Sequence, residues 1–101
     1  MVKLTVLYGH PKSAVDFEKY YAETHMPMAG QMKGVRRIEL SKVVGTPDGS
    51  DAPFYRMAEL YFDNAEHMNS VMATPEAQRT VADIANFATG GAIVLVADVQ
   101  P

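Results

Sequence analysis

In the stretch FYRMAELYFDNAE, residues 54–66, the sequence pattern changes from the alternation of a β-strand to the start of a helix. The predicted fold rests on this change. The first nine residues of the stretch alternate between two sets of side chains, as they do in a strand with two different faces. One set is Phe54, Ala58, Leu60 and Phe62, and the other is Tyr55, Met57, Glu59 and Tyr61. The next four residues, 63–66, have the spacing of a capping box, which marks a helix start. The stretch therefore predicts a strand that leads directly into a helix.

Three further strands and another helical segment surround this unit. Residues 2–8, 35–44 and 93–99 are short apolar or alternating segments, and each predicts a strand. The loop GTPDGSDAP, residues 45–53, is rich in turn-forming residues and separates the second strand from the third. Between the first two strands, apolar residues and one threonine recur at helical spacing: Phe17, Tyr21, Thr24 and Met28.

Two prolines give the helices their predicted boundaries. Pro27 has no N–H to bond the carbonyl of Glu23, so the first helix is expected to kink or stop near Met26. Pro75 follows the capping residue Thr74, and this pair predicts a fresh helix start. The apolar stripe expected on that last helix is Ala77, Val81, Ile84 and Ala88.

The predicted order is β, α, β, β, α, β, which is an α+β fold of the ferredoxin-like type. Its four-stranded antiparallel sheet has both helical segments on one face. The first, third and last strands carry apolar or aromatic residues on both faces, and a bare second face would expose more apolar surface than a monomer normally shows. We therefore expect a homodimer in which two sheets form a dimeric α+β barrel. The length predicts one domain over residues 1–101.

The composition argues against several classes of function. The chain has a net charge of −3 and no basic cluster, so no nucleic-acid partner is expected. It has no cysteine, which excludes a thiolate nucleophile and a cysteine zinc site. No apolar segment has the length of a membrane span or a signal peptide, so we expect no membrane partner and a cytoplasmic location. Its three histidines share no spacing, and no metal site is expected.

The densest group of chemically capable side chains is FEKYYAETHMPM, residues 17–28. Tyr21 and His25 are four residues apart and share a helix face. A histidine near the predicted helix break can act as an acid or a base near neutral pH. The alternative is that His25 only caps the broken helix.

Glu59 is the second candidate, because it is the one charge in the middle of its strand. A carboxylate that faces a closed barrel interior is costly unless it is hydrogen-bonded, and function is one reason to keep it there. The alternatives are a partly wet face, or pairing with Arg37 or Lys42 on the neighbouring strand. Asp83 lies beside the stripe of the last helix and is expected at the surface or as a cap.

The segment from Asp16 to Met28 resembles the EthD family, named for a protein of ethyl tert-butyl ether degradation. It matches that family's pattern of aromatic residues followed by Glu-x-His-x-Pro. Three later pieces also fit the family: AELYF at 58–62, TPE at 74–76 and ADIANF at 82–87. The resemblance implies a dimeric α+β barrel and makes His25 the catalytic candidate. Relatives with this barrel include muconolactone isomerases, polyketide cyclases, cofactor-free monooxygenases and haem enzymes.

Together the residues and the resemblance favour a cofactor-independent enzyme that acts on a small cyclic, aromatic or lactone-like molecule by proton transfer. The expected reaction is of the isomerase, cyclase or monooxygenase type. We expect a pocket between the helix-free sheet face and the first helix, where His25 moves a proton. Tyr21 and Glu59 are expected to orient the substrate or the imidazole. Tyr55 and Met57 are expected to form apolar walls.

Two alternatives remain beside the enzyme. The first is a non-catalytic protein that binds a small apolar or aromatic ligand in the same pocket, or acts as an accessory protein. The second is a purely structural barrel whose interior is filled by side chains. Turnover separates the enzyme from the binder, since a binder raises its melting temperature with ligand but leaves the ligand unchanged.

Overall fold

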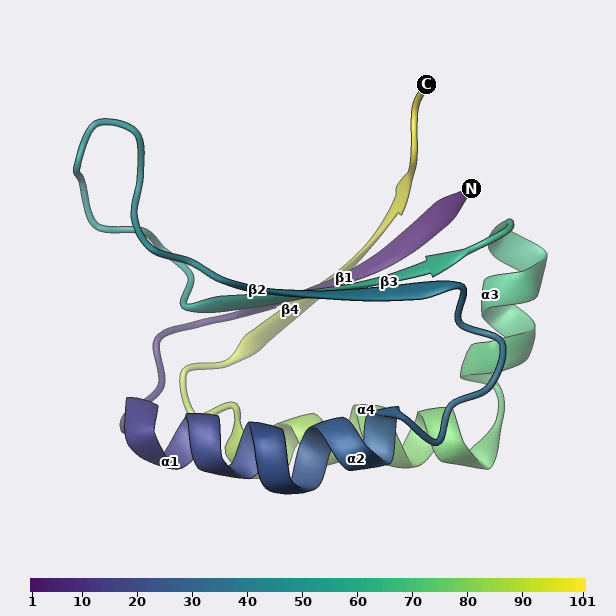
Figure 1. The fold of residues 1–101 in the computed structure, drawn as a ribbon, viewed down its shortest axis with the longest axis horizontal. Helices are drawn as coiled ribbons and strands as arrows, with labels where there is room; N and C mark the ends of the chain where they lie inside the picture. Colours follow the sequence, from purple (N-terminus) through teal and green to yellow (C-terminus); the bar gives the residue numbers. More distant parts are fainter.

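A computed structural model describes all of residues 1–101 and shows a sheet with one layer of helices beneath it (Figure 1). The elements in chain order are β1 (Val2–Tyr8), α1 (Ala14–Tyr20), η1 (Tyr21–His25), α2 (Met26–Ala29), β2 (Arg37–Lys42), β3 (Arg56–Phe62), α3 (Ala65–Met72), α4 (Pro75–Phe87) and β4 (Ala92–Asp98). None of the helices is long and apolar enough to cross a membrane.

The four strands form one antiparallel sheet in the order β2-β3-β1-β4. In this register Leu4 of β1 lies between Leu60 of β3 and Val96 of β4. The helices α1, α2 and α4 run side by side beneath one face of the sheet, and α3 packs at one end (Figure 1). The predicted α+β class, ferredoxin-like order and one-sided helix layer are confirmed.

The hydrophobic core lies between this sheet face and the helices. Strand alternation aims the even-numbered residues of β1 and β3 at the helices. The largest fully buried side chains are Tyr8 and Phe62, one from each of these strands. The core aromatics Phe17, Tyr21 and Phe87 lie against Tyr8, with ring centroids 5.4–5.7 Å from it. This aromatic packing fixes the end of the first helix against α4, where the site lies.

Side-chain caps set where the helices begin. Ser13 accepts a hydrogen bond from the Asp16 N–H at the start of α1, and Asn64 accepts one from the His67 N–H at the start of α3. The predicted start at Thr74 is confirmed, because its Oγ1 accepts from the Ala77 N–H and a proline follows it. Caps of this kind contribute about 0.5–2 kcal/mol each to helix stability.

Of the two outcomes expected near Met26, a kink or a stop, the stop is wrong, and the helix is locally distorted instead. The chain stays helical through α2 to Ala29, and His25 and Met26 both have right-handed helical backbone angles. The chain accommodates Pro27 by widening the preceding turn into a π-helix, in which the Met26 N–H donates to the Tyr21 carbonyl five residues earlier. Proline removes a hydrogen-bond donor, and a widened turn absorbs that loss without ending the helix.

The helix-free face of the sheet is more polar than expected. Lys3 pairs with Glu59 at 2.6 Å, and the Tyr61 hydroxyl donates to Glu39 at 2.8 Å. Arg37 lies over the Tyr61 ring, 4.2 Å from its centroid. The exposed apolar residues of this face lie on β4, where Ile93 and Leu95 are each about half exposed. Val94 and Val96 on the same strand are exposed to a similar extent, but they point to the covered face.

Candidate functional site

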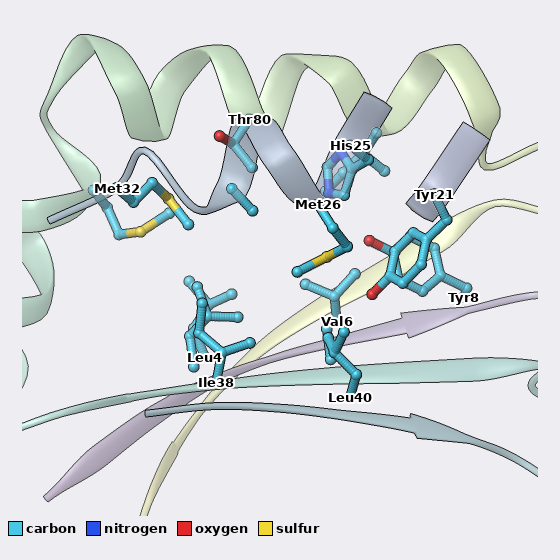
Figure 2. A pocket seen from close by; sticks show the side chains of 15 residues that line it. Leu4, Val6, Tyr8, Tyr21, His25, Met26, Met32, Ile38, Leu40 and Thr80 are labelled. Atoms are coloured by element: carbon cyan, nitrogen blue, oxygen red, sulfur yellow. The ribbon is translucent and has the colours of Figure 1, made fainter. Parts of the chain in front are cut away.

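An apolar cavity of about 40 Å³ lies between the helix-covered sheet face and the first helical segment (Figure 2). Thirteen of the fifteen residues that line it are hydrophobic, and the other two are His25 and Thr80. Three methionines form part of its wall: Met26, Met32 and Met72. Leu40 on the edge strand β2 lines the cavity and is 42% exposed.

The side of the sheet on which the cavity lies differs from the expectation. The first helix packs on the covered face, so a pocket beside it has to be on that face. Strand alternation places Ala58 and Leu60 in the cavity wall, whereas Met57 and Glu59 point to the helix-free face.

His25 reaches the cavity from the π-turn η1 and is buried. Its ring stacks on Tyr21, with centroids 5.6 Å apart, and lies 4.6 Å from the Phe87 ring. Its Nδ1 is 2.9 Å from Asp83 Oδ2, and its Nε2 has no hydrogen-bond partner. The ring is therefore held at one nitrogen, and the other is free for a ligand.

Asp83 on α4 holds the imidazole and is itself buried. Its carboxylate also accepts from the Tyr20 hydroxyl at 2.6 Å and from the Asn86 side-chain amide at 3.0 Å. Burial opposes ionisation, but the hydrogen bonds from Tyr20, Asn86 and His25 outweigh it and keep the pKa of Asp83 below its usual value. The bond to Asp83 in turn raises the pKa of Tyr20.

The expectation that Asp83 lies at the surface or caps the helix is wrong. The predicted stripe of α4 included Val81, which is 48% exposed, whereas Thr80, Asp83 and Phe87 are buried. The missed signal is the spacing of these three residues, since steps of three and four residues follow one helix face. An aspartate on that face has to meet a partner inside the protein.

The Asp83–His25 contact decides the chemistry of the imidazole. An ionised carboxylate only accepts hydrogen bonds, so Nδ1 has to carry the proton in this contact. The neutral ring then presents the lone pair of Nε2 to the cavity, and the protonated ring presents an N–H there. This is the arrangement of a general base that a carboxylate orients and that returns its proton as an acid.

Two tyrosine hydroxyls point toward the same cavity. Tyr8 comes from β1 and Tyr21 from η1, and their ring centroids are 5.7 Å apart (Figure 2). The Tyr21 hydroxyl is buried and has no hydrogen-bond partner. The guanidinium of Arg56 lies 4.8 Å from the Tyr21 ring centroid and is held by Glu18 at 2.7 Å. Hydrogen bonds from Arg56 in turn lower the pKa of Glu18.

The remaining predicted site residues lie outside this cavity. The Tyr55 hydroxyl donates to Glu18 at 3.0 Å, and its ring packs edge-on against Phe17. Glu59 pairs with Lys3 on β1, and not with either partner considered on β2. The structure thus brings His25 and Tyr21 together at one cavity and leaves Tyr55, Met57 and Glu59 apart from it.

No group of three or more His, Cys, Asp or Glu side chains is placed to hold a metal ion. A second, open depression lies beside α1 and α4, and Tyr20 and Asn86 are among its lining residues. Both of these side chains donate a hydrogen bond to Asp83, so each of them connects the buried carboxylate to the open depression.

Comparison with known proteins identifies relatives along the whole chain. The EthD domain matches residues 10–91. An uncharacterised 11.0 kDa protein from the thcB–thcC intergenic region of Rhodococcus erythropolis is 35% identical over 98 residues, which are 97% of this chain and 94% of that protein. The crystal structure of an EthD family protein from Bacillus halodurans is 31% identical, with a TM-score of 0.92 over 99% of both chains.

More distant structures share the fold alone. A dimeric ferredoxin-like protein from Thermobifida fusca is 9% identical, with a TM-score of 0.70 over 97% of this chain and 90% of that one. SnoaB of Streptomyces nogalater, a cofactor-independent oxygenase, is 13% identical, with a TM-score of 0.64 over 99% and 92% of the chains.

Proposed function

Because the chain belongs to the EthD family, we propose that it is a cofactor-independent enzyme that acts by proton transfer on a small cyclic, aromatic or lactone-like molecule. One observation carries this proposal: His25 presents a free Nε2 to an apolar cavity while buried Asp83 holds its Nδ1. A purely structural histidine of the core is expected to have partners at both nitrogens. The shared fold of a cofactor-independent oxygenase supports the same reading.

The proposed step is proton abstraction from the carbon next to a carbonyl group. The C–H bond breaks, its proton goes to His25 Nε2, and its electron pair moves toward the carbonyl oxygen to give an enolate. Return of the proton to a different carbon of a conjugated enolate completes an isomerisation. In a cyclisation the enolate carbon attacks a second carbonyl group, the electron pair of that C=O bond moves to its oxygen, and this oxygen takes the proton back from His25. Asp83 stabilises the imidazolium between these two steps, because its carboxylate stays ionised.

The second candidate is a non-catalytic protein that binds a small molecule in the same cavity. The observation in its favour is the apolar wall, in which thirteen of fifteen residues are hydrophobic. The cavity of 40 Å³ accommodates only about three water molecules. A ring-sized ligand therefore requires rotation of wall side chains. Methionine is suited to this, because it is unbranched and adaptable.

We propose that the chain forms a homodimer by apposition of two helix-free sheet faces, with residues 1–101 as one domain in each protomer. Ile93 and Leu95 of β4, which are half exposed and point to the helix-free face, support this assembly, as do dimeric proteins with the same fold. The helix-free face also carries the Lys3–Glu59 pair, so the interface combines an apolar part with a polar part. In this assembly Met57 and Glu59 lie at the interface between the sheets.

Exchange of α-protons for deuterium tests the proposed chemistry before the natural substrate is known. Cyclopentanone, γ-butyrolactone and acetophenone are incubated with the protein in D₂O, and the loss of α-proton signal is followed by NMR. We expect exchange above the buffer rate for at least one compound, and a rate about 10²–10⁴-fold lower in His25→Asn. Asparagine at this position retains an N–H that can donate to Asp83.

The matched control is His67→Asn, which changes a histidine on α3 outside the cavity. Its exchange rate should equal that of the wild type. Equal rates in wild type and His25→Asn would contradict the proposed catalytic role. A melting temperature that rises with these compounds while none of them exchanges would instead support the binding protein.

A further inference from the structure

The Tyr21 hydroxyl is a buried polar group without a partner in an otherwise apolar cavity wall. Such groups are rare in folded proteins because burial removes their hydrogen bonds to water. The proposed acid–base step uses His25 and Asp83 and leaves this hydroxyl unexplained. Phenylalanine at this position could provide the same ring without the unsatisfied oxygen.

Tyr8 provides a second hydroxyl on the same side of the cavity (Figure 2). Burial raises the pKa of Tyr8, and the neighbouring Tyr21 adds to this rise. Burial also raises the pKa of Tyr21, against the opposing effects of the Arg56 guanidinium and of the neighbouring Tyr8 hydroxyl. Both phenols therefore stay protonated at neutral pH and are able to donate hydrogen bonds into the cavity.

The rest of the wall excludes a charged ligand. Among the fifteen lining residues there is no Lys, Arg, Asp or Glu. An ammonium group placed there would lose its hydration without gaining an opposite charge, and a carboxylate would meet a positive charge only by taking up the His25 ring that the proposed step needs as a neutral base. A carbonyl oxygen has two lone pairs, so it can accept from both phenols while the rest of the molecule contacts apolar walls.

We propose that the cavity takes an uncharged carbonyl compound, of the cyclic ketone or lactone class, whose oxygen accepts hydrogen bonds from Tyr21 and Tyr8. This proposal rests on the proposed function and names the substrate class of the same site. Tyr21 stacks on His25, so an oxygen at the phenols brings the neighbouring carbon toward Nε2. The phenols then also stabilise the negative charge that develops on the oxygen when that carbon loses its proton.

A binding cycle with two ligands and two proteins tests this assignment. The probes are cyclopentanone and methylenecyclopentane, which have nearly the same shape and differ in the hydrogen-bond acceptor. Dissociation constants come from NMR shifts of the methionine methyl groups, three of which belong to the cavity wall. We expect cyclopentanone to bind the wild type about 10-fold more tightly than methylenecyclopentane, and cyclopentanecarboxylate to show no binding.

Tyr21→Phe should weaken the binding of cyclopentanone about 3- to 10-fold, because one hydrogen bond to the ketone is lost. The binding of methylenecyclopentane should stay unchanged. Its melting temperature should not fall, since the removed hydroxyl has no partner. Tyr8→Phe should act in the same direction and serves as the second variant if Tyr21→Phe folds poorly. Tyr61→Phe is the control, because its hydroxyl bonds Glu39 on the helix-free face.

Three results would overturn the assignment: equal binding of the two probes, equal weakening of both probes by Tyr21→Phe, or no binding of either probe. Failure of the proposed function gives a different pattern. A Tyr21-dependent preference for the ketone without α-proton exchange keeps the ligand class and removes the catalytic step. His25-dependent exchange that neither tyrosine variant slows keeps the catalytic step and removes the phenols from it.

Discussion

Asp83 holds a negative charge inside the helix layer, where hydrogen bonds are what keep it ionised. It receives three of them, from His25, Tyr20 and Asn86. The same carboxylate fixes which nitrogen of His25 carries the proton. The reactivity proposed for the histidine therefore depends on a residue 58 positions away in the chain.

Asp83→Asn should reverse the tautomer of His25. A neutral amide that offers its N–H₂ to Nδ1 favours a proton on Nε2, and the lone pair then no longer faces the cavity. We expect the α-proton exchange rate to fall about 10²-fold or more and the stability to fall by about 1–3 kcal/mol. Long-range ¹H–¹⁵N NMR spectra of the imidazole report the tautomer directly.

Asp63→Asn is the control for this variant, because Asp63 is an exposed carboxylate that pairs with Arg36 away from the cavity. It should leave both the tautomer and the exchange rate unchanged. An unchanged His25 tautomer in Asp83→Asn would show that the carboxylate does not set the proton position.

Asp83 should also make stability depend on pH in acid. The pKa of its carboxyl is lower in the folded chain than in the unfolded chain, so the unfolded chain binds the proton more readily. The contribution of the ionised carboxylate to the free energy of unfolding is complete above about pH 5, and it is lost as the pH falls through the folded-state pKa. Urea unfolding between pH 7 and pH 2.5 should show a shallower pH dependence for Asp83→Asn than for the wild type. Parallel curves would refute this contribution.

At the scale of elements, the π-turn η1 places His25. Wide turns of this kind in helices are often found at functional sites. Here the turn lies between α1 and α2, and one residue separates it from Pro27, which has no N–H to donate. The aromatic contacts of Tyr21 and His25 with Phe87 hold the turn against α4.

Pro27→Ala should relax this turn toward a regular α-helix, because the restored N–H can bond the Glu23 carbonyl. Removal of a proline from a helix interior favours the folded state by up to about 3 kcal/mol. We expect urea stability to stay constant or rise while the exchange rate falls about 10-fold, since His25 turns away from Asp83.

The matched control is Pro75→Ala, at the first position of α4, where no intrahelical bond is missing. It should leave the exchange rate unchanged. A Pro27→Ala structure that retains η1 would show that packing against α4, and not the proline, maintains the wide turn.

At the scale of the whole molecule, the two sheet faces have different surroundings. The covered face contains the core and the cavity. The loop between β2 and β3 and the end of β4 both project on the side away from the helices (Figure 1). Leu95 pairs in register with Thr5 and points to the helix-free face, whereas Val96 pairs with Leu4 and points to the covered face.

Sedimentation should show a particle of twice the 11.1 kDa chain mass at micromolar concentration. Leu95→Glu should produce the 11.1 kDa monomer, because the new carboxylate would be buried between the sheets without a partner. Val15→Glu is the control, since Val15 is 78% exposed on α1 and lies in the helix layer. A wild-type protein that sediments only as a monomer would remove the proposed dimer.

The order of the elements and the family could be predicted from local signals in the sequence. Alternation in residues 54–62 and the cap at Thr74 are local signals, and each acts over a few residues. The Glu-x-His-x-Pro pattern is also local, so His25 and Tyr21 could be identified from it. That their side chains lie on one side of the helix also follows from local geometry, because residues four apart share a helix face.

Only packing set the partner of His25 and the side of the sheet on which the cavity lies. Each depends on contacts between distant segments. Asp83 meets His25 only because α4 packs beside η1, and Glu59 meets Lys3 only because β3 pairs with β1. Hydrophobic periodicity predicts which face of an element is buried, but a polar residue on that face is explained only when the packed neighbour is known.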